Sequence, residues 1–271
     1  MHLNNIKFKF TAFLTTLLKT GGVCGFSLLI YSNYSYAEVA LENTVAKIKP
    51  SIVAVGTYMP KRNPRGVFLG TGFVVGDGSL VVTNAHVVPE TMDDAHLEQL
   101  AIFYSKNNVE MPLSAKLVGL DSAHDLAVLK IIGEHLLPLK LGQVSSVQEG
   151  KLYGFTGFPI GMVLGLYPVT HRGIVSAITP NAIPAIRAED LNKTLHQRLQ
   201  EPYKVFQLDA TAYPGNSGSP LYETDTGAVI GVINSVFIKE SKETVLSQPS
   251  GISYAIPVNY VENLLKAKGL H

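Results

Sequence analysis

The stretch Phe73-Val74-Val75-Gly76-Asp77-Gly78-Ser79-Leu80-Val81-Val82 indicates the class of fold. Two apolar runs flank a turn that contains Asp-Gly, and Asp-Gly accepts the positive φ angles that hairpin turns need. We therefore expect a β-hairpin here. Similar short runs, rich in β-branched residues, occupy residues 51–58, 67–75, 80–83, 101–104, 115–120, 126–132, 151–155 and 173–178. Many short strands at this spacing predict an all-β barrel or sandwich.

Two amphipathic segments outside the strand-rich region predict short helices. The first has one apolar face formed by Leu41, Val45 and Ile48. Pro50 ends this helix, because proline cannot continue the backbone hydrogen-bond ladder. Near the C-terminus, Asn259 is expected as the N-cap of a helix of about ten residues that Gly269 ends. The polar segment 186–201 predicts a helix or a surface excursion that interrupts the strands.

The first 37 residues indicate an export signal. They contain three lysines and no acidic residue before an apolar run at residues 21–31. Ser35 and Ala37 are small residues at the −3 and −1 positions of a cleavage site, so a mature chain starting at Glu38 is expected. An uncleaved membrane anchor is an alternative, although the run is shorter than the roughly 20 residues that span a bilayer. A lipoprotein signal is another, against which the valine directly before Cys24 argues.

The composition excludes several classes of function. The chain has 271 residues, 46% of them hydrophobic and 16% charged, and 22 Lys and Arg nearly balance 21 Asp and Glu. So weak a net charge cannot concentrate polyanions, and nucleic-acid binding is not expected as the main function. The single cysteine lies in the leader, which leaves the mature chain without a disulfide. The histidines show no metal-ligand spacing, so no metal is expected. No organic cofactor is expected either.

The hexapeptide Gly215-Asn216-Ser217-Gly218-Ser219-Pro220 carries the clearest chemical signal. A serine between glycines in a tight turn can expose its hydroxyl and aim nearby backbone N–H groups at one point, as an oxyanion requires. Taken alone, the hexapeptide also fits a plain loop. A serine hydroxyl is a poor nucleophile, so the functional interpretation needs a base and an orienting carboxylate elsewhere in the chain.

His86 and Asp125 can supply these two groups. His86 follows the predicted strand at 80–83, and Asp125 precedes the one at 126–132. Each of them alone fits a structural or turn residue. Together with Ser217, however, they follow the order His, Asp, Ser that the chymotrypsin-type triad shows.

Seven segments in register across residues 48–265 resemble the trypsin-like serine endopeptidases of the double β-barrel fold, and within them the protease domain of the bacterial HtrA/Deg group. They are TGFVV at 71–75, TNAHVV at 83–88, DLAVLK at 125–130, RGIVSA at 172–177, QLDA at 207–210 with PGNSG at 214–218, VIGV at 229–232 and SYAIP at 253–257. The resemblance implies one protease domain at 38–271. Its two six-stranded antiparallel β-barrels would span roughly 51–140 and 141–258, with a short N-terminal helix and a C-terminal helix.

The resemblance also implies a role for each site residue. Ser217 would be the nucleophile, His86 the general base and then acid, and Asp125 the group that orients the imidazole. Backbone N–H groups of Gly215 and Ser217, together with Asn216, would form the oxyanion hole. In zymogens of the trypsin type, the residue at the position of Asn216 is an acid that forms an ion pair with the newly cut amino terminus. A neutral asparagine cannot form this ion pair, so activation by insertion of a new amino terminus is not expected.

The specificity pocket is where the chain departs most from the HtrA/Deg group. Ser219 replaces that group's second glycine, as it does in secreted glutamyl endopeptidases. Those enzymes use a histidine on the strand after the nucleophile, and residues 231–236 contain none. We therefore expect a small, apolar S1 pocket, with selectivity for Glu as the alternative. Its floor and the edge that pairs with substrate backbone would be formed by Ala212, Asn234, Ser235 and Val236.

Three further expectations concern the surroundings of the site. His124 should lie at the surface, because neighbours on a strand point to opposite faces. Residues 157–161 resemble the group's Gly-Asn-Pro-Phe-Gly loop only loosely. Residues 218–271 can complete the second barrel and its helix but are too few for an added PDZ domain.

The sequence as a whole predicts an exported serine endopeptidase, periplasmic or secreted, that acts on proteins or peptides. Contact with a membrane is expected only through an uncleaved leader, and the oligomeric state stays open. One alternative is a peptide-binding or quality-control protein of the same fold that is weakly active or switchable, with a collapsed oxyanion hole. Another is the processing of one defined partner.

Overall fold

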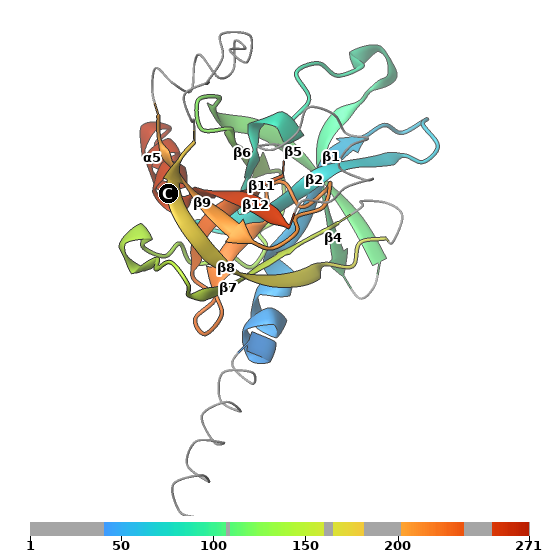
Figure 1. The fold of residues 1–271 in the computed structure, drawn as a ribbon. Helices are drawn as coiled ribbons and strands as arrows, with labels where there is room; N and C mark the ends of the chain where they lie inside the picture. Colours follow the sequence, from blue (N-terminus) through green and yellow to red (C-terminus); the bar gives the residue numbers. More distant parts are fainter. Residues whose placement is uncertain (1–40, 107–108, 160–164, 182–201, 236–250, 271) are drawn as a thin grey trace, which may run out of the picture. The chain divides into compact units, whose positions relative to one another are not determined.

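The computed structural model describes residues 41–106, 109–159, 165–181, 202–235 and 251–270. Residues 44–271 belong to one compact unit. Two closed barrels of six antiparallel strands each account for the strands in the described part of this unit (Figure 1). The first barrel has the strand order β1-β2-β3-β6-β5-β4, and the second β10-β11-β12-β9-β8-β7. The expected double-barrel fold is therefore confirmed.

Each barrel is built from consecutive strands, as hairpin-connected sheets usually are. The first comprises β1 (Ile52–Tyr58), β2 (Gly66–Val75), β3 (Leu80–Asn84), β4 (Gln99–Lys106), β5 (Val109–Asp121) and β6 (Leu126–Ile131). The second comprises β7 (Leu152–Gly157), β8 (Val169–Pro180), β9 (Lys204–Asp209), β10 (Pro220–Glu223), β11 (Val229–Asn234) and β12 (Ile252–Pro257). Short 3-10 helices lie in some of the connections, among them η1 (Lys49–Ser51) and η2 (Ala85–Val87).

The predicted hairpin joins β2 to β3, with Val75 opposite Leu80. The positive φ angles of its turn fall on the two glycines, at 64° for Gly76 and 92° for Gly78. Asp77 stabilises the turn differently from the expectation: its Oδ1 accepts hydrogen bonds from the backbone N–H and the hydroxyl of Ser79. The glycines supply the backbone freedom, and the aspartate satisfies the turn's donors.

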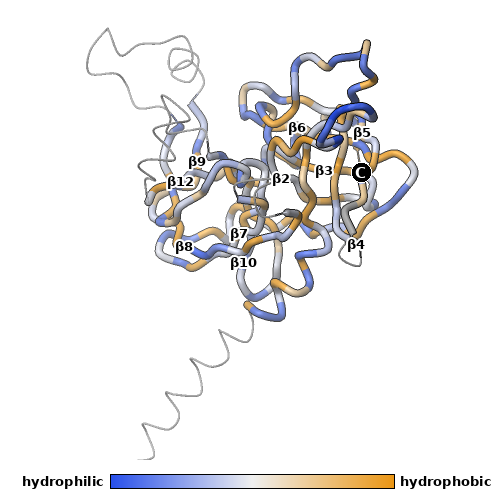
Figure 2. The backbone as a smooth tube through the Cα atoms, turned by 90° about the vertical axis from the view of Figure 1, so that its right-hand side faces the viewer, coloured by the Kyte–Doolittle hydropathy of each residue, from blue (hydrophilic) through white to orange (hydrophobic). Residues whose placement is uncertain are grey.

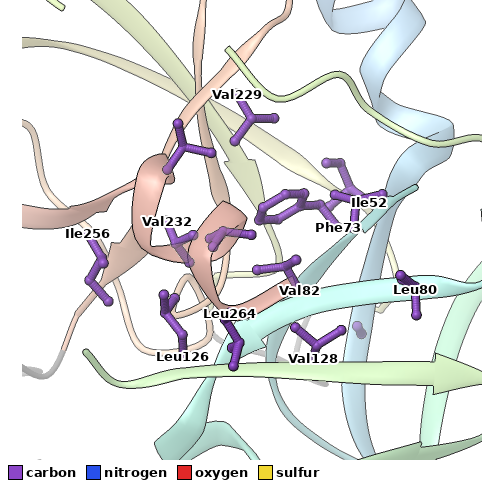
Figure 3. Close-up of a cluster of buried hydrophobic side chains, with 14 of the residues drawn as sticks. Ile52, Phe73, Leu80, Val82, Leu126, Val128, Val229, Val232, Ile256 and Leu264 are labelled. Atoms are coloured by element: carbon purple, nitrogen blue, oxygen red, sulfur yellow. The ribbon is translucent and has the colours of Figure 1, made fainter. Parts of the chain in front are cut away.

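The two barrels share an apolar core in addition to their own interiors. Figure 3 shows Val82, Leu126 and Val128 of the first barrel near Val232 and Ile256 of the second, within one buried cluster. On β3, Val81 belongs instead to a cluster inside the first barrel. A strand that is buried on both faces needs a continuous apolar run, which explains the unbroken apolar sequence from Leu80 to Val82. The shared cluster holds the adjoining ends of β3, β6 and β11 together.

Helices flank the strands as the sequence predicts. One occupies residues 41–48 and ends before Pro50, and α5 (Val258–Ala267) buries Val258, Val261 and Leu264. The prediction that Asn259 is the N-cap is wrong, because the N-cap is Pro257 and no side chain caps this end. Gly269 does end the helix, with a φ of 63°. None of the described helices is long and apolar enough to cross a membrane.

Several predicted features lie outside the described residues: the leader with its cleavage site, the polar segment 186–201, and Val236. Strands β1 to β8 agree with the predicted runs, and several of them are longer, whereas β9 to β12 lie beyond the last predicted run. Figure 2 shows hydrophobic and hydrophilic stretches alternating along the chain in both barrels. Hydrophobic stretches are expected where strands form the interior, and hydrophilic ones where connections face water.

Candidate active site

His86 and Asp125 meet because their strands are neighbours. Strands β3 and β6 are paired so that Asn84 lies opposite Leu126, which places the residue after one strand end beside the residue before the other. The Nδ1 atom of His86 lies 2.7 Å from Asp125 Oδ2, and the backbone N–H of His86 donates to Asp125 Oδ1 at 2.9 Å. Since an ionised carboxylate only accepts, Nδ1 carries the proton and Nε2 is left as a base.

The backbone of Asp125 is also held in place. Its carbonyl oxygen accepts a hydrogen bond from Asn84 Nδ2 at 3.0 Å and another from the backbone N–H of Ala85 at 3.1 Å. Asp125 adopts a φ of 53°, a left-handed conformation that aspartate tolerates better than most residues. These bonds compensate a backbone conformation that costs energy, and they aim the carboxylate at the imidazole.

Asn234 donates to the same carboxylate oxygen of Asp125 that the imidazole of His86 contacts. It is 3% exposed at the end of β11, and its Nδ2 donates to Asp125 Oδ2 at 2.8 Å. The sequence analysis placed Asn234 at the edge that pairs with substrate, yet its side chain is used within the site. Any pairing with substrate must therefore come from its backbone. No local pattern in the sequence signals this contact, because the two residues are 109 positions apart.

Two successive turns shape residues 213–219, called the serine loop below. The backbone N–H of Asn216 donates to the Tyr213 carbonyl at 3.0 Å, with Pro214 and Gly215 as the central residues. Gly215 has a φ of 96°, which the third position of a type II turn requires. The N–H of Ser219 then donates to the Asn216 carbonyl at 3.0 Å, with Gly218 (φ 88°) at the corresponding position. The spacing of the two glycines thus matches the turns.

The hydroxyl of Ser217 is engaged by Ser235. The two hydroxyls share a hydrogen bond, and the backbone N–H of Ser235 also donates to Ser217 Oγ at 3.3 Å. Within the described part of the chain, Ser217 Oγ makes no hydrogen bond to His86. The residue that follows His86 does lie close to the serine loop: a Cβ added at Gly70 would lie 2.7 Å from the side chain of Val87 and 3.0 Å from the Ser217 carbonyl oxygen.

The backbone donors of the serine loop are not equivalent. Among the residues that the structure describes, the N–H groups of Gly215 and Ser217 meet no acceptor, whereas that of Asn216 is bonded to Tyr213. The expected contribution of Asn216 is thereby corrected, because the turn itself uses its N–H. The Asn216 side chain is fully buried, and neither its Oδ1 nor its Nδ2 has a hydrogen-bond partner among the described residues. The N–H groups of Gly215 and Ser217 stay available as donors within this part of the chain.

The remaining predicted residues have different surroundings. Ala212 is 8% exposed in the apolar cluster of the second barrel, and its N–H donates to Ser253 Oγ at 2.7 Å. His124 is not the surface residue that was expected. Its ring stacks on Tyr260 with centroids 4.0 Å apart, and its Nδ1 lies 2.7 Å from Asp121 Oδ2. The left-handed φ of the next residue breaks the alternation on which that expectation was based.

The described residues offer no group of three or more His, Cys, Asp or Glu side chains that could hold a metal ion. The site instead combines an imidazole held by a carboxylate, a serine in a glycine-flanked turn, and two backbone N–H groups. Such a set suits acyl transfer through a covalent intermediate. Each barrel contributes to it, since the imidazole and the carboxylate come from the first and the serine loop from the second.

This fold and this set of side chains define a class of serine hydrolases built on paired barrels. The family model of the trypsin-like peptidase domain matches residues 70–232, which is more than half of the chain. The chain therefore belongs to the trypsin-like peptidase family.

Individual relatives narrow the likeness to the HtrA/Deg group, as the sequence motifs predict. A probable periplasmic serine endoprotease, DegP-like, of Halomonas elongata is 34% identical over 191 residues, covering 70% of this chain and 33% of the relative. Serine protease HTRA1A of Danio rerio is 30% identical over 261 residues, covering 90% of this chain and 44% of the relative. The crystal structure of Deg5 superimposes with a TM-score of 0.58 and 27% identity, covering 83% of this chain and 92% of that one. The chain thus spans less than half the length of these two curated relatives.

Proposed function

We propose that this chain is a serine endopeptidase that hydrolyses peptide bonds with Ser217 as nucleophile, His86 as general base and then acid, and Asp125 as the orienting carboxylate. The proposal is carried by two hydrogen bonds that the Asp125 carboxylate accepts from His86, one from the imidazole and one from the backbone N–H. The first of them fixes the tautomer in which Nε2 can accept a proton. The relatives' printed names, which describe serine proteases, support the same activity.

The reaction follows from these contacts. In the proposed mechanism the Ser217 hydroxyl leaves Ser235 for His86 Nε2, which requires another rotamer of Ser217. As Oγ attacks the substrate carbonyl carbon, its proton passes to Nε2, and the negative charge on the carbonyl oxygen is stabilised by the N–H groups of Gly215 and Ser217. His86 then returns the proton to the leaving amine, and a water molecule hydrolyses the acyl-enzyme by the same steps in the second half.

The substrates we propose are proteins or peptides with a small, apolar P1 side chain. The proposal rests on the small side chain of Ala212 directly before the serine loop and on residues 231–236, which contain no histidine. Export to the periplasm is proposed from the leader, and the relative from Halomonas elongata is named as a probable periplasmic protein.

A second candidate is a resting peptide-binding state of the same protein. The observation that favours it is the hydrogen bond between the hydroxyls of Ser217 and Ser235, which keeps the nucleophile on a partner other than His86. Such a protein would bind extended peptides by strand addition and react slowly, or only after a conformational change.

A fluorophosphonate probe distinguishes the two candidates. Labelling at Ser217, together with cleavage of a peptide library, supports the endopeptidase, and the library also reports the P1 preference. Ser217→Ala should abolish labelling and lower kcat by about 10⁶-fold, as loss of the serine does in a related mechanism, with an unchanged circular dichroism spectrum. Undiminished hydrolysis by this variant would rule out the proposal. Peptide binding without labelling would favour the resting state.

A further inference from the structure

One residue of the first barrel contacts the serine loop at two points, one through its side chain and one through its backbone. Thr71 lies in β2 and is fully buried. Its backbone N–H donates to the Ser217 carbonyl at 2.8 Å, and its Oγ1 donates to the Gly215 carbonyl at 2.7 Å. Thr71 therefore spans Asn216 and holds the peptide groups on either side of it. The sequence analysis did not single out this role.

The same hydroxyl has a second partner. The backbone N–H of Phe158 donates to Thr71 Oγ1 at 3.0 Å, directly after β7 ends at Gly157. Packing is tight at this point, because a Cβ added at Gly157 would lie 2.0 Å from Ser219 Oγ and 2.8 Å from Thr71 Oγ1. Because one hydroxyl both accepts from Phe158 and donates to Gly215, it connects the segment after β7 with the serine loop.

These bonds restrict the peptide group that follows Gly215. Its carbonyl oxygen is held by Thr71 Oγ1, and its N–H is held by the Tyr213 carbonyl. The Gly215 N–H belongs to the preceding peptide group, and the two groups are joined at Gly215, whose φ of 96° only glycine adopts readily. Holding the group after Gly215 therefore fixes one end of the backbone that carries the donor. If the carbonyl is released, the turn loses this constraint, and the Gly215 N–H is held less firmly in one direction.

The nucleophile's own peptide is held in the same way. The Thr71 N–H fixes the Ser217 carbonyl, and the N–H of Gly218 donates to Ile233 at 2.9 Å. Gly218 is needed here because a Cβ would lie 1.9 Å from the Thr71 carbonyl oxygen. The first barrel and the serine loop are therefore in close contact along the backbone.

We propose that Thr71 is a positioning residue for the oxyanion hole, whose hydroxyl keeps the Gly215 N–H aimed at the carbonyl oxygen of the substrate. This inference rests on the proposed function, since it assigns a role within the same reaction. It also makes the segment at Phe158 a determinant of that geometry, because Phe158 donates to the hydroxyl that holds Gly215.

Thr71→Val tests the proposal, since valine keeps the shape of threonine but has no hydroxyl. Thr71→Ser restores the hydroxyl and serves as the rescue. Thr57→Val is the matched control: Thr57 lies in β1 of the same barrel and is 4% exposed, and its hydroxyl likewise donates once, to Glu98, and accepts once, from Arg62. A library-derived peptide substrate and a peptide aldehyde of the same sequence, which forms a tetrahedral adduct with the serine, are the probes.

Loss of a whole oxyanion donor lowers kcat by about 10²- to 10³-fold, so a misaimed donor should lower it by about 10- to 100-fold in Thr71→Val. KM should change by less than about threefold, and the inhibition constant of the aldehyde should rise by the same factor by which kcat falls. The pH profile of kcat/KM should keep its shape, because the His86–Asp125 pair is untouched. Thr71→Ser should recover most of the activity, and Thr57→Val should match the wild type.

Other outcomes overturn the inference. A folded Thr71→Val enzyme with kcat and aldehyde binding like those of Thr57→Val would show that the hydroxyl has no positioning role. If the valine variant does not fold, Thr71→Ala gives the same comparison. Failure of the proposed function looks different: the wild type itself would then show no hydrolysis and no labelling that depends on Ser217, and the role of Thr71 would be refuted with it.

Discussion

Replacing Ser235 should make Ser217 more reactive. The hydroxyls of these two residues share a hydrogen bond, whereas the reaction needs the Ser217 hydroxyl on His86. Ser235→Ala removes the competing hydroxyl and leaves the backbone N–H of residue 235, which lies 3.3 Å from Ser217 Oγ. The rotamer that faces His86 should therefore be populated more often.

The size of the effect follows from the one bond that is lost. A hydrogen bond between neutral groups contributes about 0.5–1.5 kcal/mol net, and about 1.36 kcal/mol corresponds to a factor of ten. The rate of fluorophosphonate labelling should rise by about two- to thirteenfold if the Ser235-bound rotamer dominates at rest. The Ser217 hydroxyl is the only reacting group whose partner changes, so kcat/KM should rise by a similar factor.

The assay is the second-order labelling rate, measured by gel fluorescence over a range of probe concentrations. Ser146→Ala is the control, because it also removes a serine hydroxyl bond, from Oγ to the Gln143 carbonyl at 2.8 Å, but outside the site. It should label like the wild type. A Ser235→Ala protein that labels no faster than the control would refute the reasoning and would show that the Ser235 hydroxyl does not compete with His86.

Two further predictions concern the carboxylate and a half-buried histidine. Asn234→Ala should lower kcat/KM by about tenfold, because Asp125 loses a charge-assisted hydrogen bond. Such a bond contributes about 1.5 kcal/mol at the lower end of its usual range, which applies where water can replace the lost donor. Steady-state kinetics measure the effect, and an unchanged kcat/KM would contradict the prediction. Burial lowers the pKa of His171 below its ordinary value of 6.5. His171 therefore binds a proton more readily in the unfolded chain than in the folded one. The free energy of unfolding should fall as the pH drops from above about 6.5 through the lowered pKa of the folded state. His171→Phe keeps an aromatic ring against Phe155. In urea unfolding at several pH values, the free energy of unfolding of this variant should fall less with decreasing pH than that of the wild type. An equal fall in both proteins would contradict the assignment of the effect to His171.

Local signals in the sequence were sufficient to predict β1 to β8, whereas His86 and Asp125 were singled out by their order with Ser217 and by the family resemblance. The apolar run from Leu80 to Val82 and the glycines of its turn predict the hairpin, because side-chain period and backbone freedom are properties of neighbouring residues. His86 and Asp125 stand at the ends of strands that pair in register, and they form a hydrogen bond. The roles of these residues in catalysis stay predictions.

Sequence reasoning failed where it applied an average rule to a residue with unusual surroundings. His124 was expected at the surface from strand alternation, but the left-handed backbone at Asp125 turns the chain, and the ring stacks on Tyr260. Asn259 is a residue type that often caps helices, yet the helix begins two residues earlier than predicted, with Pro257 as its N-cap. The N–H of Asn216 was counted as a free donor, whereas the turn bonds it to Tyr213.

By itself, the sequence determined the kind of fold, the residue types of the site and their order along the chain. Only the packed barrels decided which atoms hold the site in place. Thr71 reaches Gly215 across 144 positions, and Asn234 reaches Asp125 across 109. A hydrogen bond tolerates only a few tenths of an ångström in distance, so such contacts depend on how the two barrels dock, which periodicity and composition do not encode.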